Sequence, residues 1–246
     1  MKLLIDIGNT TTSMALVKGK RIHKRFFIYT SREAVEPKSL KRLLGKTMSD
    51  VDNVVIVSVV PKFLGIVKES LKRVLPGVPI LVVGRNIKVP VENKYKNPKE
   101  VGQDRLVGAF AAAKICTPPV LVIDFGTAVT FDLVGEKGDY EGGLIFPGLR
   151  LGLESLVKSA ALLHRIDVKP IKGVIGRDTT GSMNKGLLLG YASMCDGIIQ
   201  LFKKEYGTRL KVVTTGGDAK LVGKYSRHIK NIHPDLIFEG LSHLIT

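Results

Sequence analysis

The sequence predicts an α/β protein made of two similar halves, and two observations support this prediction. An apolar run that holds one acid, Asp6, leads through Gly8, Asn9 and Thr10 into an alternating second strand. Residues 120–135 repeat this register: an apolar strand, an Asp, one residue, a Gly and a Thr, then an alternating strand that ends in Gly. Two such hairpins about 120 residues apart suit two similar domains that face each other across a cleft.

The first half continues with further strands and helices. Ser31 and Glu33 open a helix that is predicted to run to about Leu44. Residues 86–98 are polar and hold two prolines, which predicts a loop that crosses the cleft. The remaining predicted elements are strands at 21–29, 54–60 and 79–83 and helices at about 62–75 and 104–114.

Pro118 and Pro119 are the clearest break in the chain, and we place the boundary there, giving domains 1–117 and 118–246. The second half begins with the repeated hairpin. Its further predicted elements are strands at 139–146 and 210–214, a turn at 215–217, and helices at about 149–163 and 182–206, from 218, and after Pro234. The spacing of Gly186 and Gly190 permits close packing of the long helix.

Composition limits the class of protein. The chain has 38 basic and 22 acidic residues, but the basic residues are spread over several segments, so we expect no nucleic-acid partner. A positive field would still favour an anionic substrate. No long uncharged apolar stretch is present, so we expect neither a signal peptide nor a membrane span, and a cytoplasmic location. The two cysteines and five histidines lack metal-ligand spacing and are interpreted as core or surface residues.

The first hairpin has the chemistry of a phosphate site. Gly8 lets the backbone approach a ligand, the hydroxyls that follow it can donate to phosphate oxygens, and Asp6 can hold a hydrated cation. An ordinary hairpin with Gly and Asn in its turn is the alternative interpretation. The second copy of the motif favours the phosphate site.

The chain resembles the type III pantothenate kinases, which belong to the sugar kinase, heat-shock ATPase and actin superfamily. The resemblance covers nearly the full length and depends on six motifs in order: DIGNT at 6–10, SVVP at 58–61, YKNPKEVGQDR at 95–105, DFGTAVTFD at 124–132, GGLIFPG at 142–148 and TGG at 215–217. It implies two duplicated ribonuclease H-like (actin-like ATPase) subdomains, each a mixed five-stranded sheet with flanking helices, around an interdomain cleft. The implied activity is ATP-dependent phosphorylation of pantothenate to 4'-phosphopantothenate, the first step of coenzyme A biosynthesis.

The resemblance also implies roles for individual residues. Asp104 would be the general base that takes the proton from the pantothenate hydroxyl in an in-line transfer. By itself the residue could instead cap the following helix. Asp124 would bind a monovalent cation, K⁺ or NH₄⁺, and Asp6 would hold magnesium through water.

The binding residues that the resemblance implies fall into two groups. The substrate contacts would be Tyr95, Gly102, Gln103, Asp104, Arg105 and Thr179. The ATP contacts would be Asp6, Ile7, Gly8, Asn9, Thr10, Thr11, Thr12, Ser13, Thr127, Gly216 and Gly217. Thr180 is adjacent to Thr179 and could replace it, and Gln103 stands where the family more often has a small or apolar residue.

The family forms homodimers in which the second subunit closes part of the pantothenate pocket, so the resemblance implies a homodimer here. Two alternatives stay open: a non-catalytic transcriptional accessory factor on the same fold, and a phosphatase of the same superfamily. The basic charge would suit the first, and in the second, water would replace the hydroxyl. The presence of both Asp6 and Asp104 favours the kinase.

Overall fold

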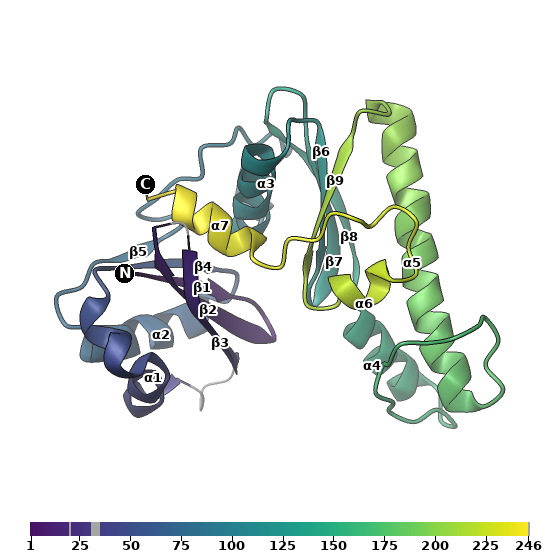
Figure 1. The fold of residues 1–246 in the computed structure, drawn as a ribbon, viewed down its shortest axis with the longest axis horizontal. Coiled ribbons are helices and arrows are strands. Elements are labelled where there is room, and N and C mark those ends of the chain that lie inside the picture. The colour runs from purple at the N-terminus through teal and green to yellow at the C-terminus, as the bar shows by residue number, and fades with distance from the viewer. Residues whose placement is uncertain (20, 31–34, 246) are drawn as a thin grey trace. The chain divides into compact units, whose positions relative to one another are not determined.

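The computed structural model describes residues 1–19, 21–30 and 35–245 and contains two compact α/β units (Figure 1). The first unit comprises Met1–Val91, Tyr95–Ala111 and Asp235–Thr246. The second comprises Glu92–Lys94 and Ala112–Pro234. Each unit is built on its own mixed sheet.

The first sheet has the strand order β3-β2-β1-β4-β5. Its strands are β1 (Lys2–Ile7), β2 (Thr11–Lys18), β3 (Arg21–Tyr29), β4 (Asn53–Ser58) and β5 (Ile80–Val82). The first three strands form an antiparallel meander, and β4 and β5 continue the sheet in parallel with β1. The helices of this unit are α1 (Pro37–Leu44), η2 (Gly45–Asp50), α2 (Pro61–Val74), η3 (Pro98–Glu100), α7 (Leu236–His243) and the part of α3 (Gln103–Ile115) up to Ala111.

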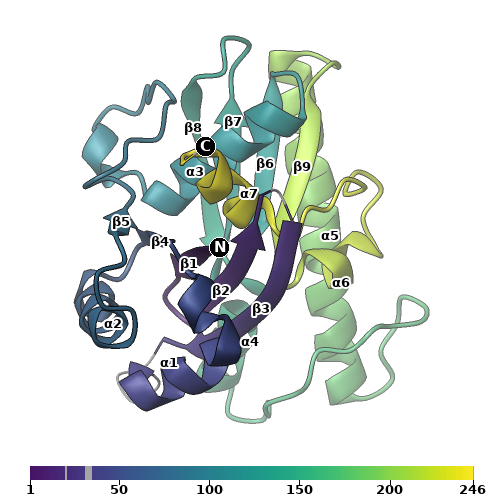
Figure 2. The ribbon, with the colours of Figure 1, turned by 60° about the vertical axis from the view of Figure 1, so that its left-hand side comes forward.

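The strand β1 carries apolar side chains on both faces of the first sheet, and these side chains must be buried from water. Helices therefore pack on both faces of this sheet (Figure 2). Leu3 and Ile5 pack in the cluster that contains residues of α1 and α2. Leu4 packs on the other face with Val107 of α3 and Phe238 of α7. The central strand is therefore fixed between two helical layers, and its carboxyl end is a rigid support for the turn that follows.

The second sheet has the order β8-β7-β6-β9. Its strands are β6 (Val120–Phe125), β7 (Ala128–Val134), β8 (Tyr140–Pro147) and β9 (Lys211–Gly216), and its helices are α4 (Leu149–Ser159), α5 (Thr179–Tyr206) and α6 (Ala219–Gly223). The strands β6, β7 and β8 form an antiparallel meander, and β9 runs parallel to β6. Residues of α5 and α6 pack against this sheet in one buried cluster.

The prediction of an α/β fold with a duplicated hairpin is confirmed, since β6, β7, β8 and β9 repeat the arrangement of β1, β2, β3 and β4. The predicted number of strands is right for the first sheet only. Within the described residues, the second sheet has four strands, and a single parallel bridge between Thr214 and Ile232 takes the place of β5. After this bridge the chain runs on to α7, which packs on the first sheet through Phe238 and Leu241. For this reason the first unit includes the C-terminal helix, whereas the predicted domains divide the chain once, at residue 118.

Several element boundaries differ from the predicted ones. The structure ends α4 at Ser159 and begins α5 at Thr179, because Asp178 caps that helix through the amide of Gly181. β9 continues through Gly216, where a turn was predicted, because Gly216 pairs with Phe125. The helix predicted from Ser31 begins at Pro37, and residues 31–34 lie outside the described part of the chain.

In the described chain, no helix combines the length and apolar character needed to cross a membrane.

Candidate active site

The turn between β1 and β2 holds the predicted phosphate residues of the first unit. The amide of Gly8 donates to the carbonyl oxygen of Thr11 over 3.0 Å and closes the turn. A Cβ at Gly8 would lie 3.1 Å from that oxygen, which is tighter than ordinary contact. Asn9 and Thr10 are exposed at the tip, so their polar groups are accessible to an approaching anion.

The hydroxyl of Thr12 is part of the structure of this turn. Thr12 is fully buried, and its Oγ1 lies 3.0 Å from Oγ1 of Thr30, whose hydroxyl donates to the carbonyl oxygen of Gly8 over 2.8 Å. The amide of Thr30 also donates to the carbonyl oxygen of Thr10. Thr30 therefore supports the turn, a role that sequence reasoning missed because no recognised motif includes this residue.

Asp6 lies near the carboxyl end of β1 and is partly buried. Side chains alternate along a strand, so Asp6 shares a face of the sheet with Leu4. Leu4 packs on that face with Val107 of α3. The carboxylate of Asp6 is thus on the same side of the sheet as the helix that holds the predicted base.

The predicted base, Asp104, lies in the first turn of α3 and is partly buried. Its Oδ1 accepts a hydrogen bond from the amide of Arg105 over 2.8 Å. A Cβ at Gly102 would clash with this same oxygen, so a glycine is needed for the carboxylate to lie where it does. The Nη2 atom of Arg105 is buried. The sequence Gly102–Arg105 is therefore a local unit that fixes the direction of one carboxylate.

A valine of the SVVP motif connects this unit to the phosphate turn. The amide of Val59 donates to the carbonyl oxygen of Ile7, the last residue of β1, over 3.1 Å. Its Cγ1 lies 3.4 Å from the place that a Cβ at Gly102 would occupy. The structure thus brings the predicted base and the predicted phosphate turn together through Val59. The SVVP motif is recognisable in the sequence, but its pattern predicts no role for Val59.

Gln103 faces a different segment. A Cβ at Gly84 would lie 2.9 Å from Cδ of Gln103, and Gly84 has a φ of +79°. The long side chain thus packs on a glycine in a left-handed turn, which is closed by a bond from the Gly84 amide to the Ile87 carbonyl oxygen. Gln103 is accommodated by this turn.

The second unit has a corresponding turn between β6 and β7. The amide of Gly126 donates to the carbonyl oxygen of Ala128 over 3.1 Å, and Thr127 is exposed. Asp124 is partly buried near the end of β6, and its Oδ1 would clash with a Cβ at Gly216. Gly216 also has a φ of +94°, so only glycine suits this position. The structure therefore places the predicted cation ligand beside the predicted adenosine segment.

The motif GGLIFPG packs against the same turn. The amide of Gly148 donates to the carbonyl oxygen of Thr127 over 3.0 Å, and a Cβ at Gly148 would clash with the carbonyl oxygens of Gly126 and Thr127. The hydroxyl of Tyr191 in α5 donates to the carbonyl oxygens of Pro147, over 2.9 Å, and Gly148, over 3.1 Å. These contacts fix the start of α4 both to the turn and to α5.

A cavity of about 240 Å³ lies in the second unit and is lined in part by α4 and by the residues just after β9. Asp218 lines it together with Leu149 and Arg150 at the start of α4. Burial raises the pKa of Asp218, and the nearby charge of Arg150 opposes this shift. A partly desolvated carboxylate beside Gly217 is a polar group that a nucleoside could meet.

Thr179 is the first residue of α5 and is exposed. Oγ1 of the adjacent Thr180 lies 3.0 Å from Nε2 of His164. Because the Thr180 hydroxyl is engaged with His164, the geometry favours Thr179 of the two for contact with a ligand.

The metal sites predicted from the sequence have few protein ligands. In the described ranges no group of three or more His, Cys, Asp or Glu side chains could hold a metal ion. Single carboxylates such as Asp6 suit Mg²⁺, which keeps several waters and binds through one or two carboxylates and the substrate phosphates. The residues present therefore fit a metal that enters with ATP.

Cys116 and Cys195 are free thiols, and burial raises the pKa of Cys195 to about 12.

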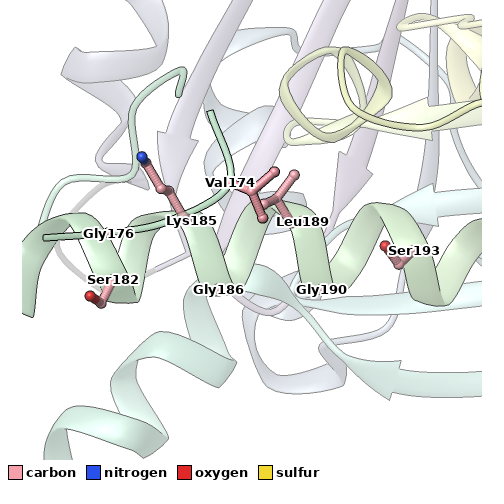
Figure 3. A pocket seen from close by; sticks show the side chains of 8 residues that line it. All are labelled: Val174, Gly176, Ser182, Lys185, Gly186, Leu189, Gly190 and Ser193. Atoms are coloured by element: carbon pink, nitrogen blue, oxygen red, sulfur yellow. The ribbon is translucent and has the colours of Figure 1, made fainter. Parts of the chain in front are cut away.

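A shallow groove of about 430 Å³ runs along α5 (Figure 3). Lys185 and Leu189 project from the helix on the side of the loop that carries Val174, and Gly186 and Gly190 lie in the helix beneath them. Val174 is 74% exposed. This groove contains the two glycines whose spacing was noted in the sequence.

Comparison with known proteins identifies the family. The profile of the type III pantothenate kinases matches residues 2–201. A type III pantothenate kinase from Halalkalibacterium halodurans is 38% identical over 98% of this chain and 97% of its own length. A second one, from Syntrophotalea carbinolica, is also 38% identical, over 98% of this chain and 96% of its own length.

Solved structures support the fold. A crystal structure from Campylobacter jejuni, titled as a Baf family transcriptional activator, aligns with a TM-score of 0.61 at 20% identity and covers 99% of this chain and 96% of its own. A Porphyromonas gingivalis protein titled as an N-acetylglucosamine kinase aligns with a TM-score of 0.53 at 15% identity, over 99% and 98% of the two chains. These likenesses show the fold alone, which is that of the actin-like sugar kinases and ATPases. The sequence matches show more, and this chain belongs to the type III pantothenate kinase family.

Proposed function

We propose that this protein transfers the γ-phosphoryl group of ATP to the primary hydroxyl of pantothenate, giving 4'-phosphopantothenate for coenzyme A biosynthesis, with Asp104 as the general base. The observation that carries the proposal is the position of the Asp104 carboxylate. It is fixed over Gly102 and connected through Val59 to the end of β1. Phosphoryl transfer needs an aligned nucleophile, neutralised phosphates and a carboxylate within hydrogen-bond reach of the attacking hydroxyl.

Residues from both units would contribute to the substrate side of this site. Arg105 supplies a cation for the carboxylate of pantothenate, and Gly102 and Gln103 shape the wall around it. Tyr95 and Thr179 supply hydroxyl groups for the polar amide and hydroxyl groups of the substrate. Asp104 takes the hydroxyl proton as the bond to phosphorus forms.

The phosphates of ATP are bound by the turns of the two hairpins. In the first, Gly8, Asn9, Thr10 and Thr11 offer amides and hydroxyls, and Ser13 pairs with Asp6 at the start of β2. The backbone of Ile7 and the buried hydroxyl of Thr12 support this turn from within. In the second unit Thr127 contacts a phosphate, and Gly216 and Gly217 let the backbone approach the adenosine.

Two ions complete the site. Magnesium, held through water by Asp6 and by the phosphates, would neutralise charge on the transferred group. Asp124 would bind a monovalent cation, K⁺ or NH₄⁺, which would compensate a partly buried carboxylate beside Gly216.

We also infer a homodimer that associates along the groove on α5. Gly186 and Gly190 allow close approach of a second helix, and Val174 and Ile175, which are 74% and 77% exposed, supply apolar surface. Light scattering on purified protein should give twice the chain mass of 26.8 kDa. A mass of one chain at micromolar concentration would contradict this inference.

The free thiols of Cys116 and Cys195 suit a cytoplasmic location.

The test of the activity is ADP release with magnesium, with and without pantothenate, first in potassium and then in sodium buffer. We expect release that requires pantothenate and is faster in potassium. ADP release that is indifferent to pantothenate would support the phosphatase alternative. Absence of turnover in every buffer would support the accessory factor, whose fold a structural neighbour shares.

A further inference from the structure

We propose that Lys94, held by Asp139 and Glu141, is a positioning residue that fixes the start of the segment carrying Tyr95 and thereby tightens the binding of pantothenate. The proposal rests on the proposed function, because the role of Tyr95 belongs to it. It adds a determinant of substrate affinity that lies in the second unit, on a segment of three residues, Glu92–Lys94.

The side chain of Lys94 forms two ion pairs. Its Nζ lies 2.8 Å from Oε1 of Glu141 and 2.9 Å from Oδ2 of Asp139. The hydrogen bonds to Glu141 and Asp139 raise the pKa of Lys94, so it stays charged at neutral pH. The side chain of Asp139 is only 13% exposed, and that of Lys94 is 38% exposed. The ion pair of Lys72 and Glu69 is different, since its two side chains are 60% and 64% exposed and are three residues apart in one helix.

The backbone of the same segment is also held. The amide of Lys94 donates to the carbonyl oxygen of Tyr140 over 2.9 Å, and the amide of Tyr140 donates to the carbonyl oxygen of Glu92 over 2.8 Å. Asn93 forms a parallel bridge with Tyr140. The segment is therefore attached to the start of β8 by an isolated parallel bridge.

Tyr140 is a rigid point for this attachment. It is fully buried, and its hydroxyl donates to Oδ1 of Asp132 over 2.7 Å. The other oxygen of Asp132 accepts from the hydroxyl of Thr130 over 2.8 Å. The bonds of the segment therefore attach it to β8, an edge strand, at the one residue of that strand that is buried.

A glycine gives room for the ion pair. A Cβ at Gly135 would clash with Oε1 of Glu141, the oxygen that Lys94 contacts. The turn is closed by a bond from the Gly135 amide to the Asp139 carbonyl oxygen, 2.9 Å. The turn between β7 and β8 and the start of β8 thus hold Asp139 and Glu141, respectively, at the place where Lys94 contacts them.

Tyr95 is the next residue after Lys94, so the attachment fixes the backbone from which Tyr95 extends. Holding a substrate-binding side chain in one position lowers the entropy lost on binding, which strengthens binding without altering the chemical step. We therefore expect the attachment to affect the KM for pantothenate and to leave kcat and the KM for ATP nearly unchanged.

The test is Lys94→Met, which keeps most of the aliphatic stem and removes the charge. We expect the KM for pantothenate to rise by about three- to tenfold, as for loss of a partly buried ion-pair network, with kcat and the KM for ATP within about twofold. Lys94→Arg should restore most of the affinity, because it keeps the charge. Lys72→Met removes a lysine from the exposed pair and should change none of these constants.

Hydrogen exchange of the peptide that covers residues 92–102 tests the attachment without any assay of activity. The amide of Lys94 should exchange faster in Lys94→Met than in the wild type and at the wild-type rate in Lys72→Met. Equal exchange in Lys94→Met and wild type would overturn the attachment. Faster exchange with an unchanged KM for pantothenate would overturn its link to Tyr95. A wild-type enzyme that ignores pantothenate would instead reject the proposed function, and the exchange result would still decide the attachment.

Discussion

At the scale of single residues, the carboxylate of Asp104 decides the proposed chemistry. Asp104→Asn keeps the shape and the hydrogen bond from the Arg105 amide but removes the base. We expect kcat to fall by about two to four orders of magnitude, the usual contribution of general base catalysis, while the KM for ATP changes little. Steady-state kinetics with both substrates check this, and Asp52→Asn, at an exposed ion pair with the N-terminus, is the control. Unchanged turnover would remove Asp104 as the base.

Gly102 gives a second prediction at this scale. In Gly102→Ala the new Cβ would clash with Oδ1 of Asp104 and displace the carboxylate. We expect kcat to fall by at least about tenfold, because a small misplacement of a catalytic group is costly. Thermal unfolding should show a folded protein.

The matched control for this variant is Gly65→Ala. Gly65 lies in the exposed middle of α2, with no atom within 4 Å of its added Cβ. This substitution should leave activity unchanged and stabilise the helix by up to about 1 kcal/mol. Equal loss of activity in the two alanine variants would show that the effect is not local to Asp104.

At the scale of elements, the long helix α5 is fixed to the loop after α6 by one carboxylate. Oδ1 of Asp196 accepts from the hydroxyl of Ser226 over 2.5 Å and from the amide of His228 over 3.1 Å, and Oδ2 accepts from the amide of Arg227 over 2.9 Å. Burial alone would raise the pKa of Asp196, but these hydrogen bonds outweigh it and bring the pKa below its usual value of 3.8. The ionised form therefore stabilises the folded state.

This geometry predicts how stability depends on pH. Because the folded pKa of Asp196 is lower than the unfolded one, its contribution is complete well above pH 4 and is lost as pH falls through the folded pKa. Asp196→Ala should lower the free energy of unfolding by about 1.5–3 kcal/mol at pH 7 and by less at pH 3. Urea unfolding followed by circular dichroism at both pH values measures this. The control is Glu136→Ala, which lies in an exposed turn of the same unit. If Asp196→Ala lowered the free energy of unfolding equally at both pH values, the role of the Asp196 charge would be contradicted.

The local sequence pattern predicted most of the helices and strands. It did not predict features that depend on contacts between residues far apart in the sequence. The hairpins were predictable because an acid, a glycine and a threonine follow an apolar strand in both halves. The end of β9 was not predictable, because Thr215 and Gly216 are residues typical of turns. They belong to the strand only because they pair with Asp124 and Phe125 of β6. The support of Thr30 for the Gly8 turn was also missed, since it depends on the pairing of β3 with β2.

At the scale of the whole molecule, the return of the chain to the first sheet could not be predicted. The apolar residues of α7 indicate a buried face, but nothing local says that Phe238 and Leu241 pack beside Leu4 of β1. The predicted boundary at residue 118 followed from Pro118 and Pro119, whereas the first compact unit includes residues up to Ala111 and again from Asp235. The order of motifs, in contrast, spans the chain and was enough to identify the family.

The net charge of +16 leads to the last prediction. Both proposed substrates are anions, so the positive field should raise their local concentration, and added salt should screen it. Raising ionic strength from about 0.05 to 0.5 M shortens the screening length from more than 10 Å to about 4 Å. With choline chloride as the added salt and potassium held constant, the KM values for ATP and pantothenate should both rise, while kcat stays within about twofold. If neither KM responds to salt, the excess of basic residues has a purpose other than substrate attraction, and binding of nucleic acid becomes the next measurement.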